Sequence, residues 1–345
     1  MALSPSVANA LQSASQVFKR LATVRRKDTK FSTGIDIGSS AVKVVVLGPR
    51  TRTGTRPIIA KKLVPLDSTQ ATDASEAVKV AMSGVDHEAR SVTLSVSGQW
   101  VIMRIIEMPI MKPAELKQAL PFEAQRYLPF NIEDVVIDGV VLGPSDAHKH
   151  WVLIIACKKD LLVRRLDWVR RAGLDVLVVD VDALALANAL LAGLNGRSLK
   201  GTRAMVNVGA QLTNLVIFKD ETPYLVRDIP WGADKLVRHT AEHLGVDAAT
   251  VGKAILGASP GADIINAMKL ATEALVTELQ LSFDYFENRF GQPPEEVLVS
   301  GGLAQNTAFI EVLMSSLSQT IKAWSPVEGL PQQFTVAYGL ALRSA

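Results

Sequence analysis

Short apolar runs alternate with stretches of helical periodicity along most of the chain. Apolar runs bounded by glycine, proline or polar residues are typical of buried strands, and apolar residues three or four positions apart predict amphipathic helices. The alternation of the two patterns predicts an α/β fold. Strands, with their closing turns, are expected at 34–40, 41–47, 57–65, 91–97, 135–142, 151–157, 204–211, 213–218, 224–229 and 295–300, and helices at 73–82, 113–128, 159–172, 182–193 and 263–290.

The opening pattern of the chain recurs in its second half. Each half starts with a strand, a turn and a return strand, and the turns are Asp36-Ile-Gly38 and Asn207-Val-Gly209. Such a repeated unit indicates an internal structural duplication. Asn195-Gly196 breaks the chain between the two. We therefore expect a tail at 1–30, a first half at 31–195 and a second half at 196–345.

Composition limits the class of protein. A chain of 345 residues is long enough for about two domains, and 48% hydrophobic with 21% charged residues excludes a disordered or fibrous chain. No apolar run approaches the roughly 20 residues that a bilayer crossing needs. The single cysteine excludes an intramolecular disulfide framework and suggests a reducing compartment. Cys157 lies in an apolar strand, where it is expected to be a small buried side chain.

Charge is concentrated at the N-terminus. Residues 1–30 carry six Lys and Arg residues against Asp28, a net charge of +5, so the rest of the chain carries −2 of the total of +3. The body therefore shows no basic stripe for nucleic acid. The tail predicts an amphipathic helix on an anionic inner-membrane surface, although a helix docked on a neighbouring subunit or a solvated linker also fits. Its apolar face would be Val7, Leu11, Ala14, Phe18 and Leu21.

Three glycine turns follow apolar strands, at 36–40, 207–211 and 300–302. Glycine lets the backbone approach a phosphate closely, and the N–H groups of a turn form an anion-binding concavity. Lys43 on the first return strand carries an ammonium that can reach phosphate oxygens, and Asp36 offers a carboxylate for hydrated Mg²⁺. Each turn alone is often a plain hairpin. The three turns in this order predict a nucleotide-phosphate site.

The sequence resembles the actin-like ATPase superfamily and, within it, the PilM family of type IV pilus assembly proteins. The resemblance covers about 31–345. It implies a duplicated, ribonuclease H-like α/β fold with two halves around a nucleotide cleft and an inserted α+β subdomain at about 86–173. The stretches that carry it are 34–45, 108–120, 122–130, 179–185, 207–215, 229–232, 281–286 and 298–302.

The resemblance implies ATP or ADP and Mg²⁺ as cofactors, with Asp36 as the metal-binding residue. The positions that match the family's cofactor-binding motifs are Asp36, Gly38, Ser39, Ser40, Lys43, Asn207, Gly209, Ala210, Gln211, Thr213, Gly232, Lys253, Gly301 and Gly302.

Several positions depart from the family pattern. Asn207 stands where the second phosphate turn usually has Asp, and an amide lacks the charge that helps to hold a hydrated Mg²⁺. Gln211 replaces a small hydroxyl residue, and Thr250 replaces the acidic residue of an Ala-Glu-x-x-Lys helix. Leu303 and Ala233 stand where the family has further glycines. We expect nucleotide binding with weakened metal binding and, at most, very slow hydrolysis.

Candidates for other chemistry are few. Asp182 lies where the actin-like fold places a residue near the attacking water, but an aspartate there also fits a helix N-cap. His239 and His243 are four residues apart without the His-Glu-x-x-His pattern, which favours an exposed helix over a metal site. No acyl-hydrolase, Walker A or dinucleotide motif is present in the sequence.

The resemblance also implies a partner. PilM-like proteins bind the apolar cytoplasmic N-terminus of an inner-membrane PilN-like protein, which places them in the cytoplasm at the inner membrane. The groove lies between the first actin-like subdomain and the inserted one. Candidate groove residues are Met108, Ile110, Met111 and Leu116, although the core of the inserted subdomain is the favoured alternative for them.

Three function classes remain from the sequence. The first is an ATP-binding scaffold that docks the partner peptide, and the second is a degenerate scaffold without nucleotide. The third, a small-molecule kinase or active ATPase, lacks a convincing base in the sequence. Homo-oligomers are compatible with each of the three.

Overall fold

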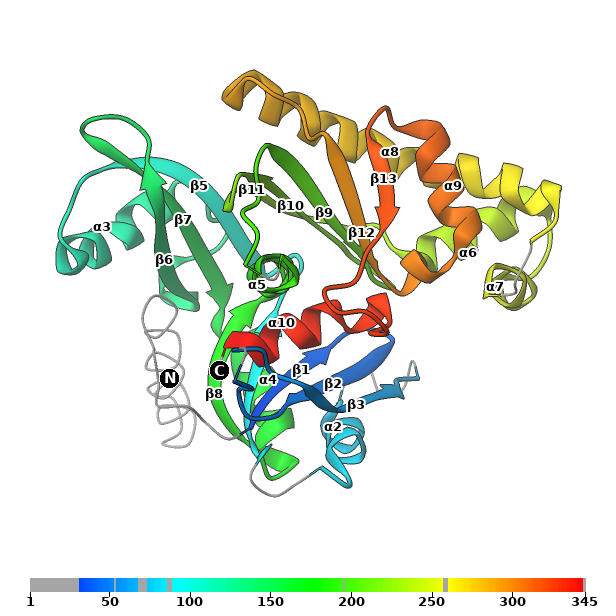
Figure 1. The fold of residues 1–345 in the computed structure, drawn as a ribbon, viewed down its shortest axis with the longest axis horizontal. Helices are drawn as coiled ribbons and strands as arrows, with labels where there is room; N and C mark the ends of the chain where they lie inside the picture. Colours follow the sequence, from blue (N-terminus) through cyan, green and yellow to red (C-terminus); the bar gives the residue numbers. More distant parts are fainter. Residues whose placement is uncertain are drawn as a thin grey trace. The chain divides into compact units, whose positions relative to one another are not determined.

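The computed structural model describes residues 31–52, 54–67, 73–85, 89–194, 196–256 and 260–343 (Figure 1). The expected membrane-contact segment 1–30 lies outside these residues. Contacts divide the chain into two compact units, one formed by residues up to Ala189 and from Val336 onward, the other by Leu190–Thr335. None of the helices described here is long and apolar enough to cross a membrane.

The first unit is built on a five-stranded sheet in the order β3-β2-β1-β4-β8. β1 pairs antiparallel with β2 and β2 with β3, whereas β4 runs parallel to both β1 and β8. Its central strands are almost completely buried, although only β2 is the near-continuous apolar run that is typical of such strands. The strands are β1 (Ser32–Ile37), β2 (Ala41–Leu47), β3 (Ile58–Pro65), β4 (Ser91–Val96) and β8 (Asp175–Val181).

The second unit repeats this sheet in the order β11-β10-β9-β12-β13. Each strand pair has the same direction as its counterpart in the first sheet. Identical order and direction confirm the duplicated α/β fold that the repeated turn predicts. The strands are β9 (Thr202–Val208), β10 (Thr213–Lys219), β11 (Thr222–Ile229), β12 (Glu296–Gly301) and β13 (Thr320–Ala323).

Most helices bury one face each, whereas residues 335–341 of the last helix are all buried. In α8, for example, the buried residues recur at helical spacing from Ala267 to Phe286. The helices are α2 (Ser75–Met82), α4 (Lys159–Arg171), α5 (Asp182–Gly193), α6 (Ala233–Leu244), α7 (Ala248–Leu256), α8 (Ala262–Phe290), α9 (Thr307–Ser316) and α10 (Thr335–Arg343), with short 3-10 turns η4 (Gly302–Gln305) and η5 (Gln332–Phe334).

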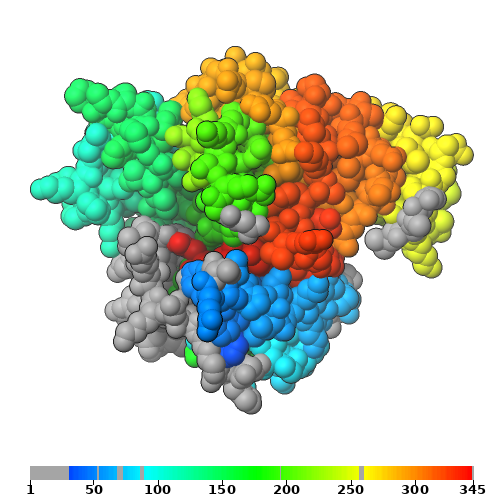
Figure 2. All heavy atoms as spheres, viewed as in Figure 1, coloured from blue at the N-terminus to red at the C-terminus, as the bar shows by residue number. Residues whose placement is uncertain are grey.

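An inserted lobe of the first unit, seen at the left in Figures 1 and 2, follows β4. Its antiparallel sheet has the order β5-β7-β6, and a small core between this sheet and helix α3 contains Met108, Leu120 and Ile154. Cys157, on the same sheet, is fully buried as predicted, and burial raises the pKa of its thiol to about 12. The elements are β5 (Val101–Pro109), α3 (Pro113–Gln125), η3 (Ile132–Asp134), β6 (Val135–Pro144) and β7 (Lys149–Lys158).

Helix α10 packs tightly against β1 and α5. A Cβ atom built on Gly34 of β1 would overlap backbone atoms of Ala337, and one on Gly339 would overlap the backbone of Ala185. At its end, Arg343 Nε lies 3.3 Å from Asp180 Oδ2. No pattern within 335–343 indicates that this helix joins the first unit.

Asp138 gives the inserted lobe a pH-dependent stability. Burial raises the pKa of Asp138 from 3.8 to about 6, against the opposing effects of the Gly139 N–H, Lys117 and Arg343. A raised pKa means that the folded state favours the protonated acid, so this stabilisation is complete only below a pH of about 4 and is lost as the pH rises through about 6.

Asp138→Asn is therefore expected to raise the free energy of unfolding at about pH 8 by roughly 1–2 kcal/mol, allowing for solvent screening, with no gain near pH 4. Thermal unfolding at the two pH values measures this, with the exposed Asp134→Asn as control. Equal gains at both pH values would contradict the assignment to titration of Asp138.

Candidate functional site

The first glycine turn joins β1 to β2 and is closed by a hydrogen bond from the Gly38 N–H to the Ala41 carbonyl, 3.0 Å long. Asp36 and Lys43 are directly opposite each other in this antiparallel pair, and Lys43 Nζ lies 2.9 Å from Asp36 Oδ2. Both side chains are largely buried, whereas Ser39 and Ser40 are exposed at the tip. The turn presents N–H and hydroxyl donors beside a neutral ion pair.

Arg165 of α4 reaches the base of this turn. Its Nη1 donates a hydrogen bond to the Ile37 carbonyl, and its guanidinium carbon lies 5.3 Å from the centre of the Trp168 ring. Burial lowers the pKa of Arg165, and the carboxylates of Asp182 and Asp36 oppose this shift. Arg165 is thus a second cation near Asp36, which the sequence analysis did not select.

Asp182 begins α5 directly after β8 and accepts a hydrogen bond of 2.5 Å from Ser95 Oγ. Ser95 lies near the carboxyl end of β4, which pairs with β1 and β8 in one sheet. The fold therefore places Asp182 and Asp36 at one edge of the sheet, with the Arg165 charge acting on both.

The second glycine turn repeats the backbone of the first. The Gly209 N–H donates to the Leu212 carbonyl at 2.9 Å. The positions of Asp36 and Lys43 are taken by Asn207 and Asn214, again directly opposite, with Asn207 Nδ2 donating to Asn214 Oδ1 at 3.0 Å. A neutral amide pair in the second turn thus matches the ion pair in the first.

Neighbouring strands set the direction of these amides. Asn214 Nδ2 donates to Asp228 Oδ1 at 2.8 Å, and Ser300 Oγ donates to Asn207 Oδ1 at 3.2 Å. A carboxylate accepts hydrogen bonds without donating any, so Asp228 orients Asn214, and Asn214 orients Asn207. Asn214 and Asp228 have no sequence signal of their own, because their importance depends on the strand register.

Glycines border the second turn within the same unit. Gly301 has a φ of 91°, and a Cβ atom there would overlap the Val208 backbone. A Cβ on Gly232 would overlap Ala210, whereas Gly302 has no atom within 4 Å of a built Cβ. Packing thus explains Gly232 and Gly301, while Gly302 leaves open space beside the strand end.

The remaining assigned residues have different surroundings. Thr213 is fully buried and its hydroxyl donates to the Trp231 carbonyl at 2.8 Å. Gln211 is exposed at the tip of the second turn, and Lys253 is exposed on α7. Thr250 stands where the family pattern has an acidic residue. Its backbone N–H donates a hydrogen bond of 2.8 Å to Asp247 Oδ1, which stabilises the start of α7.

The turns fit a nucleotide better than they fit a metal held by the protein. Two glycine turns with the same closing hydrogen bond suit phosphate. Asp36 is already paired with Lys43, and the matching position in the second turn is an amide. Among the described residues, no group of three or more His, Cys, Asp or Glu side chains could hold a metal ion. The side chains present therefore do not form an Mg²⁺ site of their own.

The partner-groove candidates divide between core and surface. Met108 is 2% exposed in the core of the inserted lobe, and Met111 and Leu116 pack against that core. Ile110 is 54% exposed. Phe122 of α3, which the sequence analysis did not select, is 75% exposed. These placements favour the core interpretation for Met108, Met111 and Leu116.

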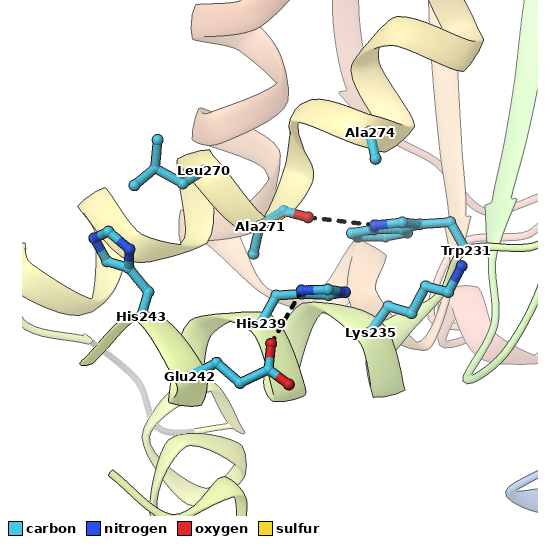
Figure 3. A pocket seen from close by; sticks show the side chains of 8 residues that line it. All are labelled: Trp231, Lys235, His239, Glu242, His243, Leu270, Ala271 and Ala274. Carbon is cyan, nitrogen blue, oxygen red and sulfur yellow. Dashed lines mark hydrogen bonds and ion pairs between the residues drawn. The ribbon is translucent and has the colours of Figure 1, made fainter. Parts of the chain in front are cut away.

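A pocket of about 480 Å³ lies between α6 and α8 in the second unit (Figure 3). Two of the polar groups that line it are partnered within the chain: Trp231 Nε1 donates to the Ala271 carbonyl, and Lys235 Nζ donates to the Pro230 carbonyl. His239 Nδ1 lies 3.3 Å from Glu242. The pocket contains none of the residues assigned to the cofactor.

Two duplicated sheets, each with a glycine turn after its first strand, define a protein of the actin-like ATPase fold. Solved structures agree. An ethanolamine utilization protein EutJ from Carboxydothermus hydrogenoformans has a TM-score of 0.54 at 14% identity, covering 98% of each chain. A Bacteroides thetaiotaomicron protein with an actin-like ATPase fold and unknown function has a TM-score of 0.51 at 9% identity, covering 92% of this chain and 97% of its own.

Within this class the family is also clear. Residues 34–345 match the family model of type IV pilus assembly protein PilM, so the chain belongs to that family. The structure of a PilM–PilN type IV pilus biogenesis complex is similar, with a TM-score of 0.80 at 24% identity, covering 90% of this chain and 98% of that one. The resemblance seen in the sequence is confirmed.

Proposed function

We propose that this chain is a cytoplasmic, ATP-binding scaffold of a type IV pilus or related secretion machine. The observation that carries the nucleotide part is the glycine turn, closed by the same backbone hydrogen bond, at the first hairpin of both sheets. Turn N–H groups and Lys43 are suited to hold phosphates. Membership of the PilM family supports the assembly role.

The scaffold docks the cytoplasmic N-terminal peptide of a PilN-like inner-membrane protein. The similar structure is a complex of PilM with PilN, which supports this partner. Large apolar side chains are also exposed in and beside the inserted lobe: Trp100, Ile110, Phe122, Tyr127 and Val141 are each at least 38% exposed. Such side chains are suited to an apolar peptide.

Calorimetric titration tests both parts of the proposal. ATP and an apolar, proline-containing N-terminal peptide of the neighbouring membrane protein should each release or absorb heat on binding. Phe122→Ala should weaken peptide binding at least several-fold and leave ATP binding intact, because a large exposed aromatic is a frequent binding hot spot. Val80→Ala, which removes an exposed apolar side chain on α2, is the control.

The alternative is a scaffold that no longer binds nucleotide, and the neutral Asn207–Asn214 pair favours it. A heat of binding for the peptide, together with no heat of binding for ATP at millimolar concentration, would establish this alternative. A kinase or active ATPase gains no support, and steady-state hydrolysis is expected to stay below about 1 s⁻¹.

Removing residues 1–30 is expected to reduce binding to anionic vesicles, most clearly at low salt, while ATP and peptide binding survive. The reason is the +5 charge of this segment, which is attracted to an anionic surface and screened by salt. Vesicle co-sedimentation and peptide titration of the truncated chain measure the two effects. Unchanged vesicle binding would exclude the segment as a membrane contact, and lost peptide binding would make it part of the groove.

A further inference from the structure

The two glycine turns have equivalent backbones and different charges, and this bears on the role of Mg²⁺. In the first unit, Asp36 and Asp182 are accompanied by the cations Lys43 and Arg165, so the four charges sum to zero. In the second unit the equivalent strand pair is Asn207 and Asn214, which carry no charge.

From these contacts we propose that this protein binds ATP without requiring Mg²⁺, because Lys43 and Arg165 already balance the carboxylates of Asp36 and Asp182 and the second turn has an amide pair in their place. The inference rests on the proposed nucleotide binding. It also identifies Arg165 as a positioning residue: it holds the Ile37 carbonyl at the base of the turn and balances Asp36 and Asp182.

Neither turn offers the unpaired carboxylates that usually favour a phosphate-bound Mg²⁺. A hydrated Mg²⁺ bound to phosphates gains from carboxylates around it. In the first unit Lys43 Nζ, 2.9 Å from Oδ2, already neutralises Asp36. In the second unit the nearest acid along the hydrogen-bonded row from Asn207 is Asp228, two strands away, which is about 10 Å.

A single substitution of Asn207 by the aspartate of the family pattern would not fit the hydrogen bonds that join Asn207, Asn214 and Asp228. Asn207→Asp alone would place a carboxylate against Asn214 Oδ1, because Asp228 holds the Asn214 nitrogen on its own side. Combining Asn207→Asp with Asp228→Asn moves the carboxylate from position 228 to the turn. The side chains keep nearly the same shapes, and the total charge is unchanged. The amide of Asn214 can then donate to residue 207 and accept from residue 228.

The experiment measures ATP affinity of the full chain by calorimetry in excess Mg²⁺ and in excess EDTA. For the unmodified chain the two affinities are expected to differ by less than about tenfold. In the Asn207→Asp, Asp228→Asn double variant, Mg²⁺ should improve the affinity by more than about tenfold. Asp228→Asn alone is the control and should leave the ratio as in the unmodified chain.

Arg165→Gln leaves the first turn with an excess negative charge. Its affinity in EDTA should fall more than about tenfold and recover with Mg²⁺, a dependence that a purely structural defect would not produce. Arg165→Lys keeps the charge and should restore most of the binding in EDTA. The exposed neighbour Arg164→Gln is the matched control.

The outcomes separate this inference from the proposed function. ATP binding by the unmodified chain in Mg²⁺ with loss in EDTA would overturn the inference and leave the proposed function intact. An absence of binding in both conditions would overturn both. If Arg165→Gln fails to fold, as judged by thermal unfolding, the double variant in the second unit still decides the result.

Discussion

Lys43→Ala is expected to weaken ATP binding by roughly 1.5–3 kcal/mol, about 10- to 150-fold, the scale of a hydrogen bond to a charged group. Lys43 is 16% exposed beside the closed turn at Gly38, where its ammonium can reach a bound phosphate. Its loss also leaves the Asp36 carboxylate unbalanced by its nearest cation, so a second, repulsive effect acts in the same direction.

Calorimetric titration of the variant measures this effect, and thermal unfolding separates it from a loss of structure. Lys79→Ala is the control, since Lys79 is 67% exposed on α2 and its partner Glu76 is 72% exposed. An unchanged ATP affinity in a folded Lys43→Ala protein would limit Lys43 to the role of structural partner of Asp36.

Gly339→Ala is expected to destabilise the first unit by more than about 3 kcal/mol or to prevent folding. The new methyl group would overlap the backbone carbonyl of Ala185, and backbone atoms of a packed helix cannot move aside as a flexible side chain can. The opposite face of α10 gives no room, because Gly34 of β1 meets the backbone of Ala337 there.

Gly252→Ala is a matched control with the opposite sign. Gly252 is also a helical glycine, but the nearest atom to a built Cβ is a Val237 methyl carbon at 3.9 Å, an ordinary contact. Alanine there should stabilise α7 by roughly 0.5–1 kcal/mol. Chemical unfolding of both variants measures the difference, and a stable Gly339→Ala protein would show that α5 and α10 can separate.

Local patterns predicted the hairpins well because strand, turn and return strand follow one another in the sequence. The separation of Asp36 and Lys43 by one tight turn was enough to place Lys43 on the return strand, and the structure pairs the two. The strand β5 was missed, since Arg104 and Glu107 interrupt its apolar pattern. Short elements such as β13 and α10 were also missed.

The site residues that were missed depend on contacts between distant segments. Arg164 and Arg165 are adjacent basic residues of one helix, yet only Arg165 meets the Ile37 carbonyl, 128 positions away. Asn214 and Asp228 gain their roles from strand register. Met108 shows the converse, because a methionine in a stretch that resembles a peptide-binding family can equally be core.

The buried thiol of Cys157 has a practical consequence for experiments on this chain. Maleimides react with thiolates, and a thiol with a pKa of about 12 is almost entirely protonated at neutral pH. Cys157 is the single cysteine of the sequence and is fully buried. A fluorophore attached to a cysteine introduced at the exposed position 110 or 122 would therefore report from that one place, without first removing the native thiol.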